Sequence, residues 1–452
     1  MHIFVRDRYF YKSFFSLLVL LALQNLITFG VNLADNLMLG AYSEAALSGA
    51  TLVNQIQFFV QMVVMGIGEG FIVLGSRYWG EQNTDAIRRL VFSVFWPAAL
   101  FGIGIWAVSF FAPYQVLGLF TNDQVILEEG VAYLRIVCFT YLLFSLTSVL
   151  LAVLRSVETV RIAFLVSCST LVLNVCFNSL LIYGKLGFPS LGVRGAAIAT
   201  LISRAVELVI VLFFLKFRDR KLHLTLRDCV GYDRELFRQY TKVSAPVIAG
   251  NAFWGIAMGI QTSVLGHLGS EAIAANSIAT TLFQIVSVAT YASAAAAGVL
   301  IGKTIGEGRS DAVRAYGVTL QVLFLIIGLL TGGVLFALRD VMLSFYTVSP
   351  QSKALAWQFI TVLSVTVIGT SYQVPCLTGI VRACGDTAFI FYNDLIFMWG
   401  LVLPASVLAA FVWKTSPLIV FWCLKMDQIL KCFVAAVKVN RMISHPEQFS
   451  LK

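Results

Sequence analysis

Apolar residues in this chain come in long runs separated by short polar segments, rather than in short alternating stretches. Each run is about 18 residues or longer, which lets an α-helix cross the roughly 30 Å hydrocarbon core of a bilayer. The pattern therefore predicts twelve transmembrane helices, over residues 13–40, 45–79, 87–112, 125–155, 160–183, 194–217, 240–268, 271–302, 312–338, 352–382, 388–412 and 416–440.

The longest polar segment, Lys216–Lys242, lies near the middle of the chain and carries charges of both signs. We interpret it as the connection between two lobes of six helices each. The expected organisation is an N-terminal lobe over 1–217, a cytoplasmic linker over 218–239, and a C-terminal lobe with a cytoplasmic tail over 240–452.

Short loop motifs recur between the two expected lobes at a nearly constant offset. The segment Ser43–Leu47 resembles Ser270–Ala274, which lies 227 residues later. Two more pairs recur in the same way, 80–86 with 306–312 and 155–159 with 382–387. Six helices per copy is an even number, so both copies have one topology and are related by a pseudo-twofold axis along the membrane normal. Transporters built from such parallel repeats bind substrate between the repeats.

Composition supports a membrane protein, because 59% of the 452 residues are hydrophobic and only 12% are charged, against about 25% charged in soluble domains. The net charge is +9, which in a soluble protein would suggest nucleic acid as a partner. Here 24 of the 32 Lys and Arg residues fall on the side of the termini, and 5 on the other side. Positive residues are retained in the cytoplasm, so both termini are expected there and no nucleic acid is expected.

The eight cysteines and four histidines show no metal-binding spacing. We expect buried structural cysteines, no metal and no cofactor. A membrane-embedded enzyme would need a catalytic cluster such as His and Asp on one helix face. No such cluster is present in the sequence, so an enzyme is not expected.

At this point the chain resembles the multidrug and toxic compound extrusion (MATE) family in the order and spacing of five segments: Asn32–Gly40, Tyr78–Gly80, Leu154–Arg155, Gly192–Thr200 and Val381–Thr387. The resemblance implies a secondary antiporter of the bacterial inner membrane, surrounded by lipid and acting as a monomer. Such a protein exports organic, often cationic or amphipathic compounds by alternating access, in exchange for H⁺ or Na⁺.

Asp35 lies within the first predicted helix, near its outer end. A charge at this depth costs several kcal/mol unless it is protonated, paired or in contact with water. It is either satisfied by a neighbouring helix for packing, or it binds and releases the coupling cation, as the matching aspartate of the family does. Asn174 and Asn178 are four residues apart and share a helix face. As neutral partners of Asp35 they would leave no fixed positive charge beside it.

The same lobe contains further polar residues that could contribute to the site or to its packing. Thr200 matches a family hydroxyl near the coupling site, whereas Asn178 stands where a branch of the family has a second aspartate. Glu69 lies in a glycine-rich part of the second helix, where a structural or cavity-lining role competes with a role in proton relay. Arg204 and Glu207 are three residues apart, so we expect a structural ion pair.

The second lobe has few acidic residues in its helices. Asp394 and Asp427 are expected near the cytoplasmic ends of helices 11 and 12, in contact with water and mainly structural. Pro375 should kink helix 10. Trp254 either faces lipid, packs in the protein, or binds an organic cation through its ring face. The residues expected to line a substrate cavity here are Asn251, Trp254, Gln261, Tyr372 and Gln373.

Two other transport functions remain as alternatives. A flippase for lipid-linked saccharides shares the plan of two six-helix lobes, but proteins of that kind line their cavity with arginines, and only Arg135 and Arg204 lie well inside predicted helices, away from their ends. A channel would usually show rings of repeated charge, and the two lobes share no embedded charge.

The predicted topology can be tested by cysteine labelling. In a background without the native cysteines, Ser190→Cys should react with a membrane-impermeant maleimide from outside the cell. Arg220→Cys should react only after the membrane is permeabilised. Labelling of both positions from the same side would contradict the twelve-helix assignment.

Overall fold

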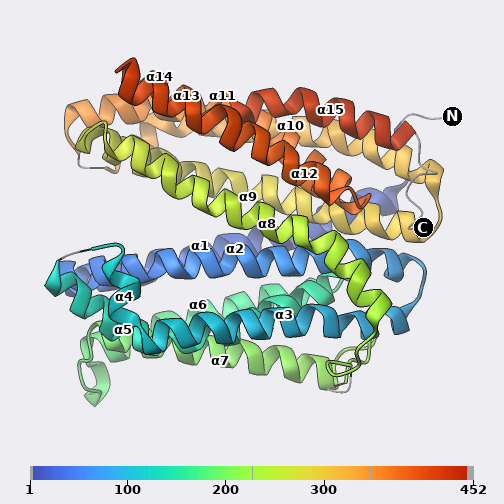
Figure 1. Cartoon of the computed structure of the whole chain (residues 1–452), viewed down its shortest axis with the longest axis horizontal. Coiled ribbons are helices and arrows are strands. Elements are labelled where there is room, and N and C mark those ends of the chain that lie inside the picture. Colours follow the sequence, from blue (N-terminus) through green and yellow to red (C-terminus); the bar gives the residue numbers. More distant parts are fainter. Residues whose placement is uncertain (1–3, 122, 226–227, 347, 445–452) are drawn as a thin grey trace. The chain divides into compact units, whose positions relative to one another are not determined.

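The structure is a computed structural model, which describes residues 4–121, 123–225, 228–346 and 348–444. Nearly all of these residues are helical (Figure 1). In chain order the elements are α1 (Arg8–Tyr42), α2 (Glu44–Gly80), α3 (Thr84–Phe111), α4 (Pro113–Gly118), α5 (Gln124–Ser156), α6 (Arg161–Tyr183), the 3₁₀ turn η1 (Lys185–Gly187), α7 (Val193–Phe217), α8 (Arg234–Gly266), α9 (Ser270–Gly306), α10 (Ser310–Ser344), α11 (Pro350–Val374), η2 (Pro375–Val381), α12 (Thr387–Asp394), η3 (Leu395–Val402), α13 (Leu403–Val407), η4 (Leu408–Val412), α14 (Pro417–Lys425) and α15 (Asp427–Ser444).

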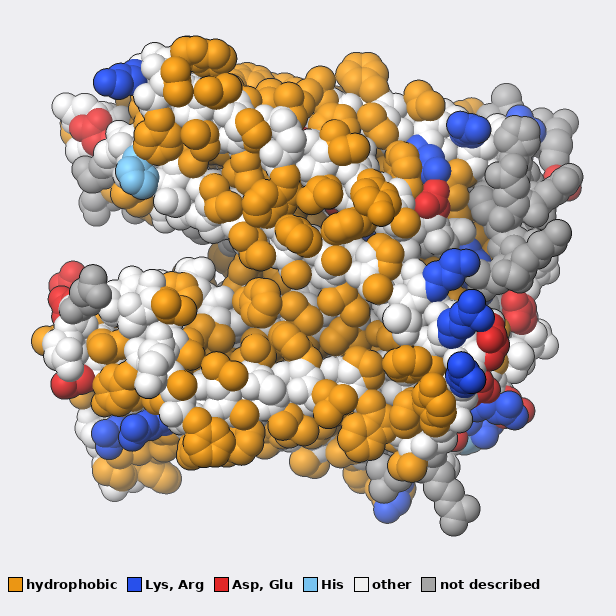
Figure 2. All heavy atoms as spheres, in the orientation of Figure 1, with side chains coloured by type: hydrophobic (Ala, Val, Ile, Leu, Met, Phe, Trp, Pro, Cys, Tyr) orange, Lys and Arg blue, Asp and Glu red, His pale blue; other side chains and the backbone are white. Residues whose placement is uncertain are grey.

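Within the described part of the chain, eleven helical spans are long and apolar enough to cross a membrane. The twelfth predicted span is present as α14 and α15, which are interrupted at Met426. Its charged residues, among them Lys425 and Asp427, explain why it is less apolar. On the face drawn in Figure 2, hydrophobic side chains cover the long sides of the helices, and charged side chains gather towards their ends. The expected all-α, twelve-helix membrane fold is therefore confirmed.

The tenth and eleventh predicted helices contain π-helical segments. Pro375 begins η2, which follows α11 without a break. Because proline has no N–H to donate and crowds the preceding turn, a wider turn at this point is its expected effect. The eleventh helix is built from α12, η3, α13 and η4, in which α-helical and π-helical turns alternate.

The chain forms two compact units, and their boundaries fall inside helices. One unit is Leu23–Ile248, and the other combines Met1–Ala22 with Ala249–Lys452. Helices α1 and α8 therefore each contribute to both units. The lobes 1–217 and 240–452, with their linker 218–239, were drawn from the sequence repeat and stay a prediction. The part of the expected tail beyond residue 444 lies outside the described residues.

In the Leu23–Ile248 unit, α2 and α5 pack closely because small residues face one another. A Cβ atom added to Gly49 would lie 2.6 Å from the backbone nitrogen of Gly130, and one added to Gly68 would lie 2.9 Å from Ala152 Cβ. Small residues let membrane helices approach closely and gain dispersion energy along their length. Helices α3, α4, α6 and α7 also belong to this unit, together with the parts of α1 and α8 that fall within it (Figure 1).

In the other unit, the start of α1 packs on α10. The Phe10 and Tyr316 rings lie 4.4 Å apart, and Val5 N donates a hydrogen bond to Thr319 Oγ1 at 3.1 Å. Helices α9, α10 and α11 pack together, and α11 also packs on α15. This second contact is close, since a Cβ atom at Gly369 would lie only 2.3 Å from the carbonyl oxygen of Gln428.

The close α2–α5 contact gives a test of the fold. Gly49→Ala places a methyl group against backbone and should lower the thermal unfolding midpoint, because overpacking costs about 1–3 kcal/mol. Gly104→Ala is the matched control, since nothing lies within 4 Å of its added Cβ. Helix propensity favours alanine over glycine by about 1 kcal/mol, so the control midpoint should stay equal or rise. Equal midpoints for the two variants would argue against the packing described.

Candidate functional site

Asp35 lies in the second half of α1, within the Leu23–Ile248 unit, and is half-buried. The Nδ2 group of Asn178 in α6 donates one hydrogen bond to Asp35 Oδ1 and another, at 3.0 Å, to Asn174 Oδ1. Asn174 is 1% exposed and Asn178 is 0% exposed. The structure thus brings these three predicted residues together, in an environment that excludes most water.

Asn178 keeps one polar atom without a partner. Its Oδ1 atom is buried and accepts no hydrogen bond from any residue that the structure describes. An unsatisfied buried acceptor costs about 1–3 kcal/mol. Amide and carboxylate oxygens are also typical ligands of hard cations. The Asp35–Asn178 pair is therefore suited to take up one further donor or cation.

Thr200 lies near the Asp35 group and interacts with Tyr133, a residue that was not predicted from the sequence. Its hydroxyl donates to the carbonyl of Ala196 at 3.0 Å, and its side chain also interacts with the hydroxyl of Tyr133 in α5. Tyr133 is 4% exposed and lies within electrostatic reach of Asp35. No motif or spacing marks this tyrosine, which in the sequence is one aromatic residue in an apolar run.

The ion pair predicted between Arg204 and Glu207 is present in α7, with 2.8 Å between Arg204 Nη1 and Glu207 Oε2. Thr170 in α6 donates a hydrogen bond to the second carboxylate oxygen, Glu207 Oε1. Arg204 also lies within electrostatic reach of Asp35. The direct partners of Asp35 are therefore neutral, as expected, and Arg204 adds an electrostatic attraction that the sequence did not reveal.

Comparison with known proteins decides the family. A family model described as MatE matches residues 21–180 and 246–408, which is more than half of the chain. The chain belongs to the MATE family.

Relatives and solved structures agree with this assignment. A Thermotoga maritima protein described as probable multidrug resistance protein NorM is 26% identical over 391 residues, covering 85% of this chain and 82% of that protein. A mutant of the Vibrio cholerae MATE transporter VcmN has a TM-score of 0.88 at 16% identity, covering 98% of this chain and 99% of that one. A MOP superfamily transporter from Pyrococcus furiosus, whose binding pocket is described as having reverse polarity, has a TM-score of 0.87 at 17% identity and 96% coverage of both chains. The protein is thus a multi-pass MATE efflux transporter.

Glu69 is placed in α2 of the MATE fold, where its carboxylate acts electrostatically on Arg155 at the end of α5. It is half-buried between flanking glycines that pack closely, Gly68 on α5 and Gly70 on α8. These contacts are compatible with the structural role considered for it, and its part in a proton relay stays a prediction.

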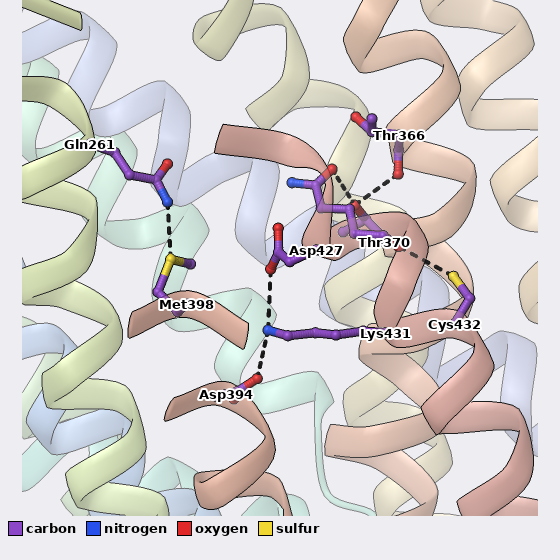
Figure 3. Close-up of polar contacts among 9 residues, drawn as sticks. Gln261, Thr366, Thr370, Asp394, Met398, Asp427, Lys431 and Cys432 are labelled. Atoms are coloured by element: carbon purple, nitrogen blue, oxygen red, sulfur yellow. Dashed lines mark hydrogen bonds and ion pairs between the residues drawn. The ribbon is translucent and has the colours of Figure 1, made fainter. Parts of the chain in front are cut away.

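The five residues expected to line a substrate cavity lie in the other unit. Gln261 is 5% exposed and donates to Met398 Sδ at 3.1 Å, as Figure 3 shows. The hydroxyl of Tyr372 donates to Gln321 Oε1 at 2.8 Å. Trp254 packs on an apolar core cluster, Gln373 is buried and Asn251 is half-buried. A shared substrate cavity formed by these five residues stays a prediction.

Two charged groups in this second unit are more buried than the sequence predicted. Asp394 and Asp427 were expected within reach of water near the cytoplasmic ends of their helices, which agrees with the 35% exposed side chain of Asp394. Lys431 was counted among the cytoplasmic positive charges. Instead, Lys431 is 4% exposed and Asp427 is 5% exposed, and both carboxylates pair with Lys431. The spacing of Asp427 and Lys431, four residues on one helix face, is the sequence signal that could have revealed the pair.

The Arg204–Glu207 pair can be tested by paired substitutions. Arg204→Gln leaves a carboxylate buried without its cation and should destabilise the protein by about 3–5 kcal/mol, seen as a lower thermal unfolding midpoint. Adding Glu207→Gln removes the unpaired charge and should restore most of the loss. A double variant as unstable as Arg204→Gln alone would show that the pair is not the source of the effect.

Proposed function

We propose that this MATE transporter is a cation-coupled antiporter that exports organic, often cationic compounds across the bacterial inner membrane. The coupling ion is H⁺ or Na⁺, and it binds at Asp35, with Asn174, Asn178 and Thr200 as further members of the site. The observation that supports this most directly is the unpartnered Asn178 Oδ1 beside the Asp35 carboxylate. This arrangement can gain a hydrogen bond or an ion contact without breaking one.

Coupling requires that the ion and the exported compound favour opposite facing states of the transporter, since a ligand shifts only an equilibrium between states that it binds unequally. Asp35 joins α1 to α6 through Asn178. Binding a cation at Asp35 changes both the charge and the hydrogen bonding at this contact. The packing of α1 on α6 is therefore the element whose equilibrium the ion biases.

Arg204 does not prevent this exchange, because its guanidinium is already paired with Glu207. Two charges that contact each other act on a third group more weakly than either would alone. Asp35 therefore keeps a site that a cation can occupy and leave.

Export requires a defined orientation of the protein in the membrane, and we infer this orientation from the distribution of Lys and Arg. Of the 24 residues assigned to the side of the termini, three that the structure describes are buried and no longer count, Arg77, Arg382 and Lys431. The remaining excess over the 5 residues on the opposite side still favours cytoplasmic termini. The loop residues Ser190 and Arg220, chosen for labelling, are both exposed.

The alternative of a saccharide-lipid flippase has less support. Holding a pyrophosphate in a membrane cavity calls for uncompensated arginines, which bind phosphate oxygens in a bidentate way. Of the two arginines well inside predicted helices, Arg204 is paired with Glu207, which leaves Arg135.

Asp35→Asn tests the coupling site. Asparagine has the shape of the protonated carboxyl group, so expression and thermal stability should stay near those of the wild type. Efflux of ethidium driven by an ion gradient should be abolished, because the site can no longer change its charge. The matched control is Asp85→Asn at an exposed helix start, where the carboxylate is 76% exposed and efflux should persist.

The measurement uses proteoliposomes in which pH and Na⁺ gradients are imposed separately, so that the driving gradient identifies the coupling ion. Wild-type efflux rates in Asp35→Asn would contradict the assignment, and Glu69 would be the next carboxylate to test. Flux that follows neither gradient would contradict antiport itself.

A further inference from the structure

A second group of charged side chains lies in the unit that contains α12 and α15. Lys431 Nζ is 2.8 Å from Asp394 Oδ1 and 3.2 Å from Asp427 Oδ2, so one ammonium group is shared by two carboxylates (Figure 3). The side chains of Lys431 and Asp427 are 5% and 8% exposed, whereas that of Asp394 is 35% exposed. The ammonium group is thus buried, and one of its two partners is open to the outside.

The side chain of Asp394 is 35% exposed, which raises the question of what its open side meets. A carboxylate that faced lipid would carry a cost of several kcal/mol, and embedded charges are found next to protein or in water-filled cavities, so we infer that this side meets water. The opposite side of the same group is closed by Lys431. Asp394 is therefore the member of this group that a ligand can reach.

Both carboxylates occupy irregular points of their helices. Asp394 is the last residue of α12, and the π-helical segment η3 starts directly after it. Asp427 is the first residue of α15, after the interruption at Met426. Irregular turns of this kind occur often at functional sites. The positive end of the α15 helix dipole also favours a negative charge at Asp427.

Aromatic rings flank Asp394 along its own helix. The Phe397 ring centroid lies 5.9 Å from Lys431 Nζ. Phe391 and Trp399 both pack on Phe253, with ring centroids 6.1 Å and 5.7 Å apart. Aromatic faces attract organic cations and ammonium groups by the same electrostatic interaction. The surroundings that hold Lys431 would therefore also suit an organic cation.

We propose that Asp394 binds the positively charged group of an exported organic cation, and that Lys431 is its exchangeable internal counter-ion. In the empty site Lys431 occupies Asp394. An arriving cation takes this carboxylate, and Lys431 moves fully onto Asp427, which it already contacts. The exchange leaves no buried ammonium group unpaired, which would otherwise carry a large desolvation cost.

Asp427 is suited to accept the lysine. Besides its contact with Lys431, it interacts electrostatically with Lys425 in α14. Both lysines stabilise its negative charge, so it stays available as a counter-ion while Asp394 is occupied by the ligand. The proposal rests on the proposed export of cationic compounds, but it does not depend on Asp35 or on the coupling ion.

The test is equilibrium binding of tetraphenylphosphonium to the purified full-length protein in detergent. Asp394→Asn should weaken binding by about tenfold or more, because the ligand loses its counter-ion. Asp427→Asn should weaken it by a similar factor although Asp427 does not touch the ligand, since Lys431 can then no longer leave Asp394. Adding Lys431→Met to Asp427→Asn frees Asp394 and should restore affinity to the wild-type value or above.

This order of affinities separates the proposal from a purely structural role. If the three residues only held α12 to α15, adding Lys431→Met to Asp427→Asn would remove the last ion pair between Asp394 and α15 and leave Asp394 unpaired, so binding would not be restored. Asp394→Glu keeps the charge and should bind within about threefold of the wild type, and thermal unfolding confirms that each variant is folded. Unchanged binding in Asp394→Asn, or no rescue in the double variant, would overturn the proposal.

These experiments distinguish failure of the proposed Asp394 site from failure of the proposed antiport function. Asp35→Asn tests the proposed antiport by loss of gradient-driven transport, whereas the Asp394, Asp427 and Lys431 variants are compared by tetraphenylphosphonium binding with Asp35 intact. Equal binding by all variants together with gradient-driven efflux by the wild type would overturn the Asp394 site and leave the antiporter intact. A wild-type protein that neither binds nor transports organic cations would overturn both.

Discussion

A charged side chain in the interior of a bilayer has no bulk water to solvate it, so it is stable only beside an opposite charge, in a hydrogen-bonded group or at a water-filled space. This constraint accounts for the arrangement of embedded polar groups in both units. Arg204 is paired with Glu207, and Lys431 is paired with two carboxylates. Asp35 differs from them, because its direct partner is the neutral amide of Asn178.

The kind of partner decides whether a carboxylate can exchange a ligand. An ion pair with one partner, such as Arg204 with Glu207, is costly to open because each half is then left buried and unpaired. A carboxylate held by an amide can gain a proton or a metal cation without leaving another charge behind. A lysine shared by two carboxylates can release one of them and keep the other. Asp35 and Asp394 can thus both change partner, although for different reasons. Asp35 is held by a neutral amide, and Asp394 shares its lysine with a second carboxylate.

Helix packing supports these groups differently in the two units. In the Leu23–Ile248 unit, small residues such as Gly49 and Gly130 bring α2 and α5 into close contact, and the helices there are regular over most of their length. In the other unit the helices contain three π-helical segments within the described residues, and the last helix is interrupted at Met426. Irregular turns cost backbone hydrogen bonds, so their position next to Asp394 and Asp427 is consistent with a functional rather than a packing role.

Several features followed from the sequence alone because their physical causes are local. A run of apolar residues is long enough to cross a bilayer whatever its neighbours are, so the helices and the membrane fold could be predicted, and ordered motifs pointed to the family. Asn174 and Asn178 share a face because they are one helical turn apart. The proximity of Tyr133 and Arg204 to Asp35 and the burial of Lys431 could not be predicted in this way. Each depends on contacts between helices that are distant in the chain. The pairing of Asp394 with Lys431 also depends on an interrupted helix and a π-helical turn. These irregular turns change the direction in which side chains point, and only the packed structure determines where they occur.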